Sequence, residues 1–262
     1  MPKKLFTSTA KYYALYRPGY PTKFFKHIAK TFSLNGEGRC LDLGAGTGQL
    51  AIPLARYFDE VVAVDPEQEM LTEGKKAAQN AHVKNIQWIK GSSENLRELG
   101  KFRLVVMGRS FHWMNQKKTL AMLYKMIEPG GGIVIVSERR KDTLWTPSSK
   151  WRLAASEVIK KHLGEQRRAG SGYFKVSEKR FEDFIRESPF KKFEIYRQNV
   201  RNQWDMKGAL GFFYSMSFSS KAVLGKSVRA FERDMKRELL KANPSGRFTE
   251  NTVLEALIVK RK

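Results

Sequence analysis

The segment 41–48, which reads LDLGAGTG, constrains the fold of this chain more than any other part of it. An apolar, strand-like lead-in runs into three glycines at alternate positions, and helix-forming residues follow over 49–56. Glycine lets the backbone pass close to a ligand where any side chain would collide. A strand, a tight glycine turn and a helix in this order predict a doubly wound α/β sheet whose turn holds a nucleoside cofactor.

The spacing of the glycines and of one carboxylate narrows the kind of cofactor. The dinucleotide fingerprint is G-x-G-x-x-G, but here the third glycine comes one residue earlier and Asp42 lies two positions before the first. A second apolar strand, residues 61–65, ends at Asp65, 19 residues after Gly46. An acidic side chain meets a ribose at ~20 residues in such folds. Asp65 is therefore the candidate acceptor of the ribose hydroxyls, against the alternative of a solvated strand-end carboxylate.

Three more pairs of strand and turn follow in order. Residues 86–90 lead into the turn GSSE at 91–94, residues 104–107 lead into GRSFHWM at 108–114, and a proline-glycine turn at 129–132 precedes the β-branched strand 133–137. In open α/β sheets, ligands gather at the carboxyl ends of the strands. The turn after the fourth strand, which contains His112, is therefore expected at the ligand-binding edge.

Together these motifs resemble the class I S-adenosylmethionine (AdoMet) methyltransferases. The G-x-G-x-G turn resembles their motif I, the turn at 91–94 resembles their Gly-Asp/Ser-Ala-Glu turn, and the proline-glycine turn resembles their Leu-Lys-Pro-Gly-Gly segment. The resemblance covers residues 41–138 and implies AdoMet as the cofactor. It also implies a Rossmann-like, mostly parallel seven-stranded sheet with a C-terminal antiparallel strand and inserted cap helices.

The N-terminal segment 13–21 (YALYRPGYP) narrows the resemblance. It is similar to the Tyr-x-x-Tyr-Arg-Pro-x-Tyr-Pro opening of small-molecule methyltransferases related to trans-aconitate methyltransferase. In that group the segment closes over the cofactor, and the Phe-His-Trp sequence at 111–113 occurs after the fourth strand. The segment 211–217 (GFFYSMS) resembles the aromatic-serine part of a late helix in the same group.

The resemblance assigns roles to individual residues. The cofactor-binding set is Tyr13, Arg17, Gly44, Ala45, Gly46, Thr47, Asp65, Pro66, Met70, Ser92, Ser93, Glu94 and Arg109. The acceptor-binding set is Tyr20, His112, Trp113 and Arg139, with His112 as the candidate catalytic residue. His112 is interpreted as a base, as a hydrogen-bond donor to the acceptor, or as a packing imidazole. Arg109 is interpreted as the partner of an acceptor carboxylate or as a brace for the backbone. Met70 is expected under the adenine or in ordinary core packing.

The chain is expected to form a single methyltransferase domain over 1–262. A lid and helix are expected over 1–35, the AdoMet-binding core over 36–140, cap helices over 141–190 and 200–247 around a strand at 192–198, and the final strand over 252–261. Three histidines, His27, His82 and His162, carry no partner motif and are expected at the surface. No metal site is expected, because no His/Cys pair has zinc spacing.

The composition of the chain indicates where the protein is located and which kinds of partner it can bind. A formal charge of +23 favours anionic partners, although lysines and arginines scattered at helical spacing are also typical of solvated faces. A single cysteine, Cys40, forbids an internal disulfide. No apolar run approaches the ~20 residues that span a bilayer, and the start lacks the features of a signal peptide. A cytoplasmic monomer without membrane contact is expected.

These observations favour one reaction class. The turn after the fourth strand lacks the Asp/Asn-Pro-Pro-Tyr/Phe sequence of exocyclic-amine nucleic-acid methyltransferases, and Cys40 is misplaced for pyrimidine C5 chemistry. The sequence predicts methyl transfer from AdoMet to a small or peptidic acceptor that is anionic, with a carboxylate favoured. The alternatives are an N- or O-methyltransferase of a biosynthetic scaffold and an RNA-binding protein that retains the AdoMet fold; nucleic acid is a less favoured partner.

Overall fold

A mixed sheet forms the centre of the protein. The computed structural model describes residues 8–94, 96–139, 147, 149–166, 168–169, 172–173 and 179–261. Within them, one seven-stranded sheet has the order β3-β2-β1-β4-β5-β9-β8. Its strands are β1 (Arg39–Leu43), β2 (Glu60–Asp65), β3 (Ile86–Lys90), β4 (Phe102–Gly108), β5 (Ile127–Arg139), β8 (Glu194–Trp204) and β9 (Phe248–Lys260). In this sheet β9 runs in the direction opposite to the other six strands, so that it pairs antiparallel with β5 and β8. The predicted fold class is confirmed.

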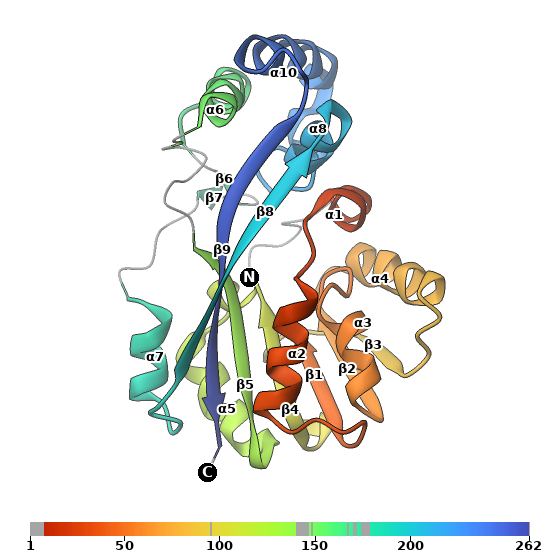
Figure 1. Cartoon of the computed structure of the whole chain (residues 1–262), viewed down its shortest axis with the longest axis vertical. Coiled ribbons are helices and arrows are strands. Elements are labelled where there is room, and N and C mark those ends of the chain that lie inside the picture. The colour runs from red at the N-terminus through yellow and green to blue at the C-terminus, as the bar shows by residue number, and fades with distance from the viewer. Residues whose placement is uncertain are drawn as a thin grey trace.

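Helices connect the strands and cover both faces of the sheet (Figure 1). The helices are α1 (Ala10–Tyr16), α2 (Thr22–Thr31), α3 (Ala51–Leu54), α4 (Gln68–Asn80), α5 (Gln116–Met126), α6 (Lys150–Leu163), α7 (Phe181–Glu187), α8 (Met206–Tyr214), α9 (Lys221–Leu224) and α10 (Val228–Ala242). Short 3-10 turns are η1 (Ala55–Tyr57), η2 (Arg97–Leu99), η3 (Phe111–Trp113) and η4 (Gly225–Ser227), and β6 (Arg168–Ala169) pairs with β7 (Gly172–Tyr173).

Alternate residues of each strand feed two separate cores. Side chains of a strand point to opposite faces with a period of two. In β1, Cys40 packs with α2 and α3 on one face, whereas Leu41 and Leu43 pack with α5 and α7 on the other. All three side chains are at most 1% exposed. The apolar strand that leads into the glycine turn is thereby fixed on both faces, which holds the turn at a defined place on the sheet edge.

The paired strands β8 and β9 continue beyond the sheet into a second lobe (Figure 1). From Val200↔Thr252 to Trp204↔Phe248 the two strands pair with each other and with no other described strand, whereas Val253 also pairs with Arg139 of β5. The lobe, which we call the cap, comprises α6, α8, α9 and α10. It has its own core, built on aromatic residues that include Trp151, Trp204, Phe212, Phe213, Phe231 and Phe248.

The boundaries around the cap differ from the sequence expectation. The strand expected over 192–198 is β8 and runs on to Trp204, so the expected cap segment 200–247 begins with strand. The final strand begins at Phe248 instead of 252. The polar sequence of 199–203 carries no clear alternation, and its strand conformation comes from pairing with β9, which satisfies its backbone groups. The helix of this segment begins at Met206, where the Asp205 side chain accepts a hydrogen bond from the Gly208 amide at 2.6 Å.

Other parts of the expected organisation lie partly outside the described residues. Residues 1–7 of the lid segment, and 140–146, 148 and 174–178 in and before the first cap segment, are among those that the structure does not describe. The helix expected over 49–56 is the single turn α3 followed by η1; Pro53 within it has no amide for a helical hydrogen bond. Among the described helices, none combines the length and the apolar character needed to cross a membrane.

Candidate functional site

The glycine turn follows β1 with its backbone in the left-handed region. Gly44, Gly46 and Gly48 have φ values of 77°, 55° and 80°. Two of these positions are also crowded: a Cβ on Gly44 would lie 2.4 Å from the Cβ of Ser110, and one on Gly48 would lie 2.7 Å from the Trp88 ring. A Cβ on Gly46 would meet nothing within 4 Å. The turn is therefore closely packed at two glycines and faces open space at the third.

Asp65 holds this turn from the end of β2. Its Oδ2 accepts a hydrogen bond from the Gly46 amide at 2.8 Å, and its Oδ1 accepts one from the Glu67 amide at 2.9 Å. Burial raises the pKa of Asp65 to about 6, although both backbone bonds favour the ionised form. A carboxylate offers about four lone-pair sites, so acceptor capacity remains on both oxygens. The sequence analysis predicts this carboxylate as a ribose ligand, which stays a prediction, and it missed that Asp65 fixes the turn.

Two further polar side chains of the turn are buried. Asp42 is 1% exposed, and its Oδ2 accepts a hydrogen bond from the Ala51 amide at 2.9 Å. Burial raises the pKa of Asp42 to about 7. Thr47 is 3% exposed, and its hydroxyl has no hydrogen-bond partner among the described residues. Buried polar groups rarely lack a partner. The orphaned hydroxyl, the open side of Gly46 and the Asp65 carboxylate fit a polar ligand such as AdoMet.

The residues expected around the adenine lie beside the next strands. Met70 is in α4 and is 3% exposed, and the exposed Pro66 precedes that helix. After β3, the Ser92 hydroxyl accepts a hydrogen bond from the Glu94 amide at 3.3 Å. Ser93 and Glu94 lie at a groove that continues along α5 past Asn115, Lys118, Met122 and Lys125. Within this turn Glu94 is exposed and Ser92 is half-buried, whereas Ser93 is buried.

The N-terminal helix α1 joins the cap to the core. It contacts α8 of the cap and α4 of the core. A Cβ on Gly211 of α8 would lie 2.1 Å from the Tyr16 ring, so the helices approach closely there. The Arg17 guanidinium lies 5.2 Å from the centre of the Tyr13 ring and 5.1 Å from that of Phe212, distances typical of cation–π contacts. Gln49, next to the glycine turn, donates a hydrogen bond to the Arg17 carbonyl at 3.2 Å.

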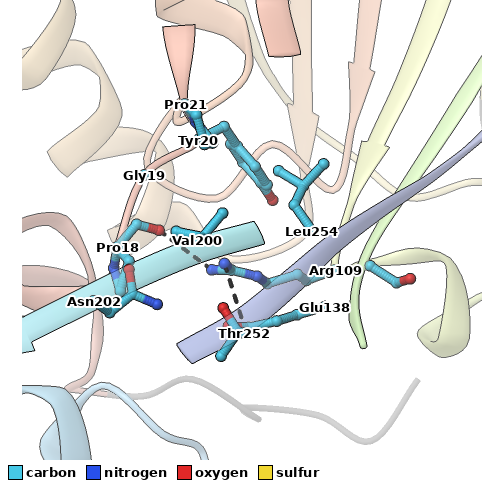
Figure 2. A pocket seen from close by; sticks show the side chains of 11 residues that line it. Pro18, Gly19, Tyr20, Pro21, Arg109, Glu138, Val200, Asn202, Thr252 and Leu254 are labelled. Atoms are coloured by element: carbon cyan, nitrogen blue, oxygen red, sulfur yellow. Dashed lines mark hydrogen bonds and ion pairs between the residues drawn. The ribbon is translucent and has the colours of Figure 1, made fainter. Parts of the chain in front are cut away.

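Arg109 and Tyr20 meet in a small pocket at the carboxyl ends of β4 and β5 (Figure 2). Arg109 directs Nη1 to the Pro18 carbonyl at 3.4 Å and Nη2 to the Glu138 carboxylate at 3.8 Å. Burial alone would lower the pKa of Arg109, but its pKa is raised, and the Glu138 carboxylate is the charged neighbour that favours the protonated guanidinium at neutral pH. Burial raises the pKa of Tyr20 well above its usual value, so its phenol stays protonated. Val200, Asn202, Thr252 and Leu254 of β8 and β9 close the pocket.

The proposed acceptor residues are less well gathered. His112 is exposed on η3, and its ring centre lies 4.6 Å from that of the half-buried Trp113. Arg139 ends β5, and its side chain lies outside the described part of the chain. His162 corrects the expectation of a surface histidine: its side chain is 11% exposed, and its Nε2 lies 3.1 Å from Asp234 Oδ2. That contact belongs to the packing of α6 on α10 and is distant in the fold from the glycine turn.

Sequence reasoning missed several residues that shape the site. Glu138 pairs with Arg109, and the Ser110 hydroxyl donates to the Leu43 carbonyl at 2.7 Å. Ser110 thereby ties the turn after β4 to the glycine turn after β1. Trp204 Nε1 donates to the Tyr16 carbonyl at 3.5 Å. None of these residues belongs to a motif with a recognisable spacing. The one sequence signal nearby is Gly211, a glycine within an aromatic segment, which is typical of a close approach such as that of α8 to Tyr16.

Comparison with known proteins shows that this chain is similar to methyltransferases. Residues 40–131 match the sequence profile of a family described as a methyltransferase domain. An uncharacterized methyltransferase of Schizosaccharomyces pombe is 28% identical over 155 residues, which cover 58% of this chain and 57% of that protein. A probable S-adenosylmethionine-dependent methyltransferase of Saccharomyces cerevisiae is 26% identical over 118 residues, or 44% of this chain and 40% of that protein. The chain spans about half the length of these curated relatives.

Solved structures share the whole fold. A SAM-dependent methyltransferase from Thiobacillus denitrificans, in complex with S-adenosyl-L-homocysteine, superposes with a TM-score of 0.56 at 16% identity. The superposition covers 100% of this chain and 99% of that one. A SAM-dependent methyltransferase from Geobacter sulfurreducens, with the same ligand, gives a TM-score of 0.55 at 16% identity over 99% of this chain and 98% of that one. At these identities the likeness establishes the fold.

Proposed function

We propose that this chain, a class I S-adenosylmethionine-dependent methyltransferase, transfers the methyl group of AdoMet to a small anionic acceptor, with a carboxylate oxygen as the methyl-accepting atom. The observation that supports the cofactor assignment is the glycine turn pinned by Asp65 at the carboxyl ends of β1 and β2. Bound AdoMet would supply a methyl group on a sulfonium, which is reactive toward nucleophiles without further activation by the protein.

The chain's own residues would bind AdoMet and orient it toward the acceptor. Asp65 offers its remaining lone pairs to the ribose, and the buried Thr47 hydroxyl and the Gly46 backbone face the same ligand. Ser92, Ser93 and Glu94 stand at the turn after β3. The N-terminal residues Tyr13 and Arg17 lie over this edge of the sheet through the contacts of α1 with α4 and α8. Alignment of reactants of this kind is the main contribution that a protein makes to such a transfer.

The arrangement of α1 supports a small acceptor. Because α1 packs on both the core and the cap, it restricts access to the carboxyl edge of the sheet. A folded protein or a duplex would require α1 to move away, whereas a metabolite of a few atoms would not. The N-terminal segment 13–21 also supports a relation to trans-aconitate methyltransferase-like enzymes, which is part of this proposal.

The charge of the chain supports an anionic acceptor. With 49 basic and 26 acidic residues, the protein attracts anions toward its surface. A carboxylate is ionised at neutral pH and needs no general base, which agrees with the exposed position of His112 on η3. An amine or hydroxyl acceptor of a biosynthetic scaffold remains the competing proposal, in which His112 takes a proton.

Methyl transfer to panels of acceptors tests the proposal. The purified protein is incubated with AdoMet carrying a deuterated methyl group and with di- and tricarboxylates, amines and phenols, and the products are identified by mass. We expect the label on a carboxylate, as a base-labile methyl ester. Label that survives mild base would move the assignment to nitrogen or to a hydroxyl. Failure to bind S-adenosylhomocysteine in calorimetry would reject the enzyme class for this chain.

A further inference from the structure

Arg109 occupies an unusual place in the backbone. It follows β4 with a φ of 55°, the left-handed region that favours glycine. Its amide donates to the Val136 carbonyl at 2.9 Å, which fixes this conformation against β5. Non-glycine residues in this region are held there by their surroundings and cluster at functional sites. The conformation sends the guanidinium toward the N-terminal segment.

Two residues of that segment, Pro18 and Tyr20, contact this one side chain (Figure 2). The Pro18 carbonyl accepts a hydrogen bond from Nη1 at 3.4 Å, and the Tyr20 ring centre lies 5.2 Å from Cζ. On the opposite side, Glu138 of β5 balances the charge. Tyr20 is itself packed against Gly108, where a Cβ would lie 2.6 Å from its hydroxyl.

We propose that Arg109 is a positioning residue that holds the N-terminal segment 13–21 closed over the cofactor edge, with Glu138 as its counter-charge. It is not the ligand of the acceptor carboxylate. The Arg109 side chain is 19% exposed, and its Nη1 and Nη2 already face Pro18 and Glu138, whereas its Nε is buried without a hydrogen-bond partner among the described residues. An acceptor carboxylate at Arg109 would have to displace Glu138 from it. The inference rests on the proposed function only for the identity of the cofactor.

The geometry also couples the two sides of the site. Arg109 lies one residue before Ser110, whose hydroxyl holds the Leu43 carbonyl at the start of the glycine turn. The same pocket is closed by Val200 and Thr252 of the paired strands that carry the cap. The Arg109 side chain therefore contacts both the N-terminal segment and β5, and it lies beside the two strands that carry the cap. Closing of the segment is expected to depend on the charge and the fork shape of this residue.

Hydrogen exchange of the ligand-free protein tests the inference without any assumption about activity. We expect Arg109→Gln to speed exchange of amides over 10–20 at least tenfold, while amides of β1 and β2 are unchanged. Arg109→Lys keeps the charge and should give an intermediate rate. Arg109→Gly removes the side chain but relieves the left-handed backbone, so it should match Arg109→Gln if the guanidinium is responsible. Unchanged exchange over 10–20 in Arg109→Gln overturns the proposal.

A second variant and a kinetic readout separate positioning from acceptor binding. Glu138→Gln removes only the counter-charge and should speed exchange over 10–20 several-fold; it also serves if Arg109→Gln fails to fold. With a working acceptor, Arg109→Gln should raise the KM for AdoMet at least tenfold and the acceptor KM less than threefold. The reverse pattern, with a raised acceptor KM and a normal exchange rate, would make Arg109 the acceptor ligand. If the wild-type protein does not bind S-adenosylhomocysteine, the proposed function is refuted, whereas the result of the exchange experiment still stands.

Discussion

Asp65 Oδ2 lies 2.8 Å from the Gly46 amide nitrogen, so the carboxylate at the end of β2 fixes the glycine turn that follows β1. The same side chain holds the Glu67 amide at 2.9 Å and is 8% exposed. One carboxylate therefore shapes the cofactor site before any ligand arrives and retains lone pairs for a ribose.

The first prediction concerns Asp65. Asp65→Asn keeps the shape of the side chain but leaves one acceptor oxygen in place of two. We expect the affinity for S-adenosylhomocysteine to fall at least tenfold in calorimetry, in line with the ~1.5–3 kcal/mol of a charge-assisted hydrogen bond. Asp59→Asn is a matched control, because Asp59 also accepts from a glycine amide, that of Gly38 at 2.7 Å, but at the opposite end of the strands. Equal losses in both variants would contradict a ribose contact.

The second prediction concerns pH and Asp42. Burial raises the pKa of Asp42 from 3.8 to about 7, so ionisation of this group lowers the stability of the folded state. We call this loss of stability the penalty. The penalty is absent below about pH 4 and grows as the pH rises to about 7. Asp42→Asn removes the penalty and should stabilise the ligand-free protein, by about 2–3 kcal/mol more at pH 8 than at pH 5. Urea unfolding at both pH values measures this. A gain that does not change with pH would mean that the burial of Asp42 is relieved by water.

The third prediction concerns the contact of α1 with the cap. A Cβ on Gly211 would lie 2.1 Å from the rigid Tyr16 ring, so Gly211→Ala must displace α1. We expect faster hydrogen exchange over 10–16 and at least tenfold weaker binding of S-adenosylhomocysteine. Gly19→Ala, at a position where a Cβ meets nothing within 4 Å, should change neither quantity. If Gly211→Ala binds the ligand normally while α1 exchanges quickly, α1 does not cover the cofactor.

The sequence foretold the sheet because the apolar strands and their turns obey local rules. Leu41 and Leu43 alternate with Cys40 between two cores, and the turn glycines adopt backbone angles that other residues rarely reach. The length of β8 could not be foreseen, because residues 199–203 become a strand only by pairing with β9. The Arg109–Glu138 pair joins the residue after β4 to a residue of β5 through a left-handed backbone angle at Arg109, which no periodicity reveals.

The fourth prediction concerns the positive charge. Arg229, Arg233 and Lys236 lie along one face of α10, are exposed and have no ion pair to another described residue. We expect only weak, sequence-independent binding to RNA that is lost near physiological salt, with a log-log salt slope of about −0.7 per phosphate on single strands. Changing all three residues to Glu should abolish it without altering the affinity for S-adenosylhomocysteine. Tight binding that persists at physiological salt, with methyl transfer to RNA, would favour the nucleic-acid alternative.

The last prediction concerns His112 and decides between the two proposed acceptor types. A general base contributes ~10²-fold or more to turnover. If the acceptor is a carboxylate, His112→Ala should lower kcat by less than this factor and should leave the shape of the pH–rate profile unchanged, because the acceptor stays ionised from about pH 6 to 9 and gives up no proton. If the acceptor is an amine or a hydroxyl, activity should rise through the titration of an imidazole, at a pKa of ~6.5, and the rise should vanish in His112→Ala. His82→Ala is the control, since His82 is exposed in the loop after α4. A sigmoid profile that His112→Ala abolishes would reject the carboxylate, whereas a profile of the same shape in wild type and His112→Ala, with a small loss of kcat, would reject proton removal by His112.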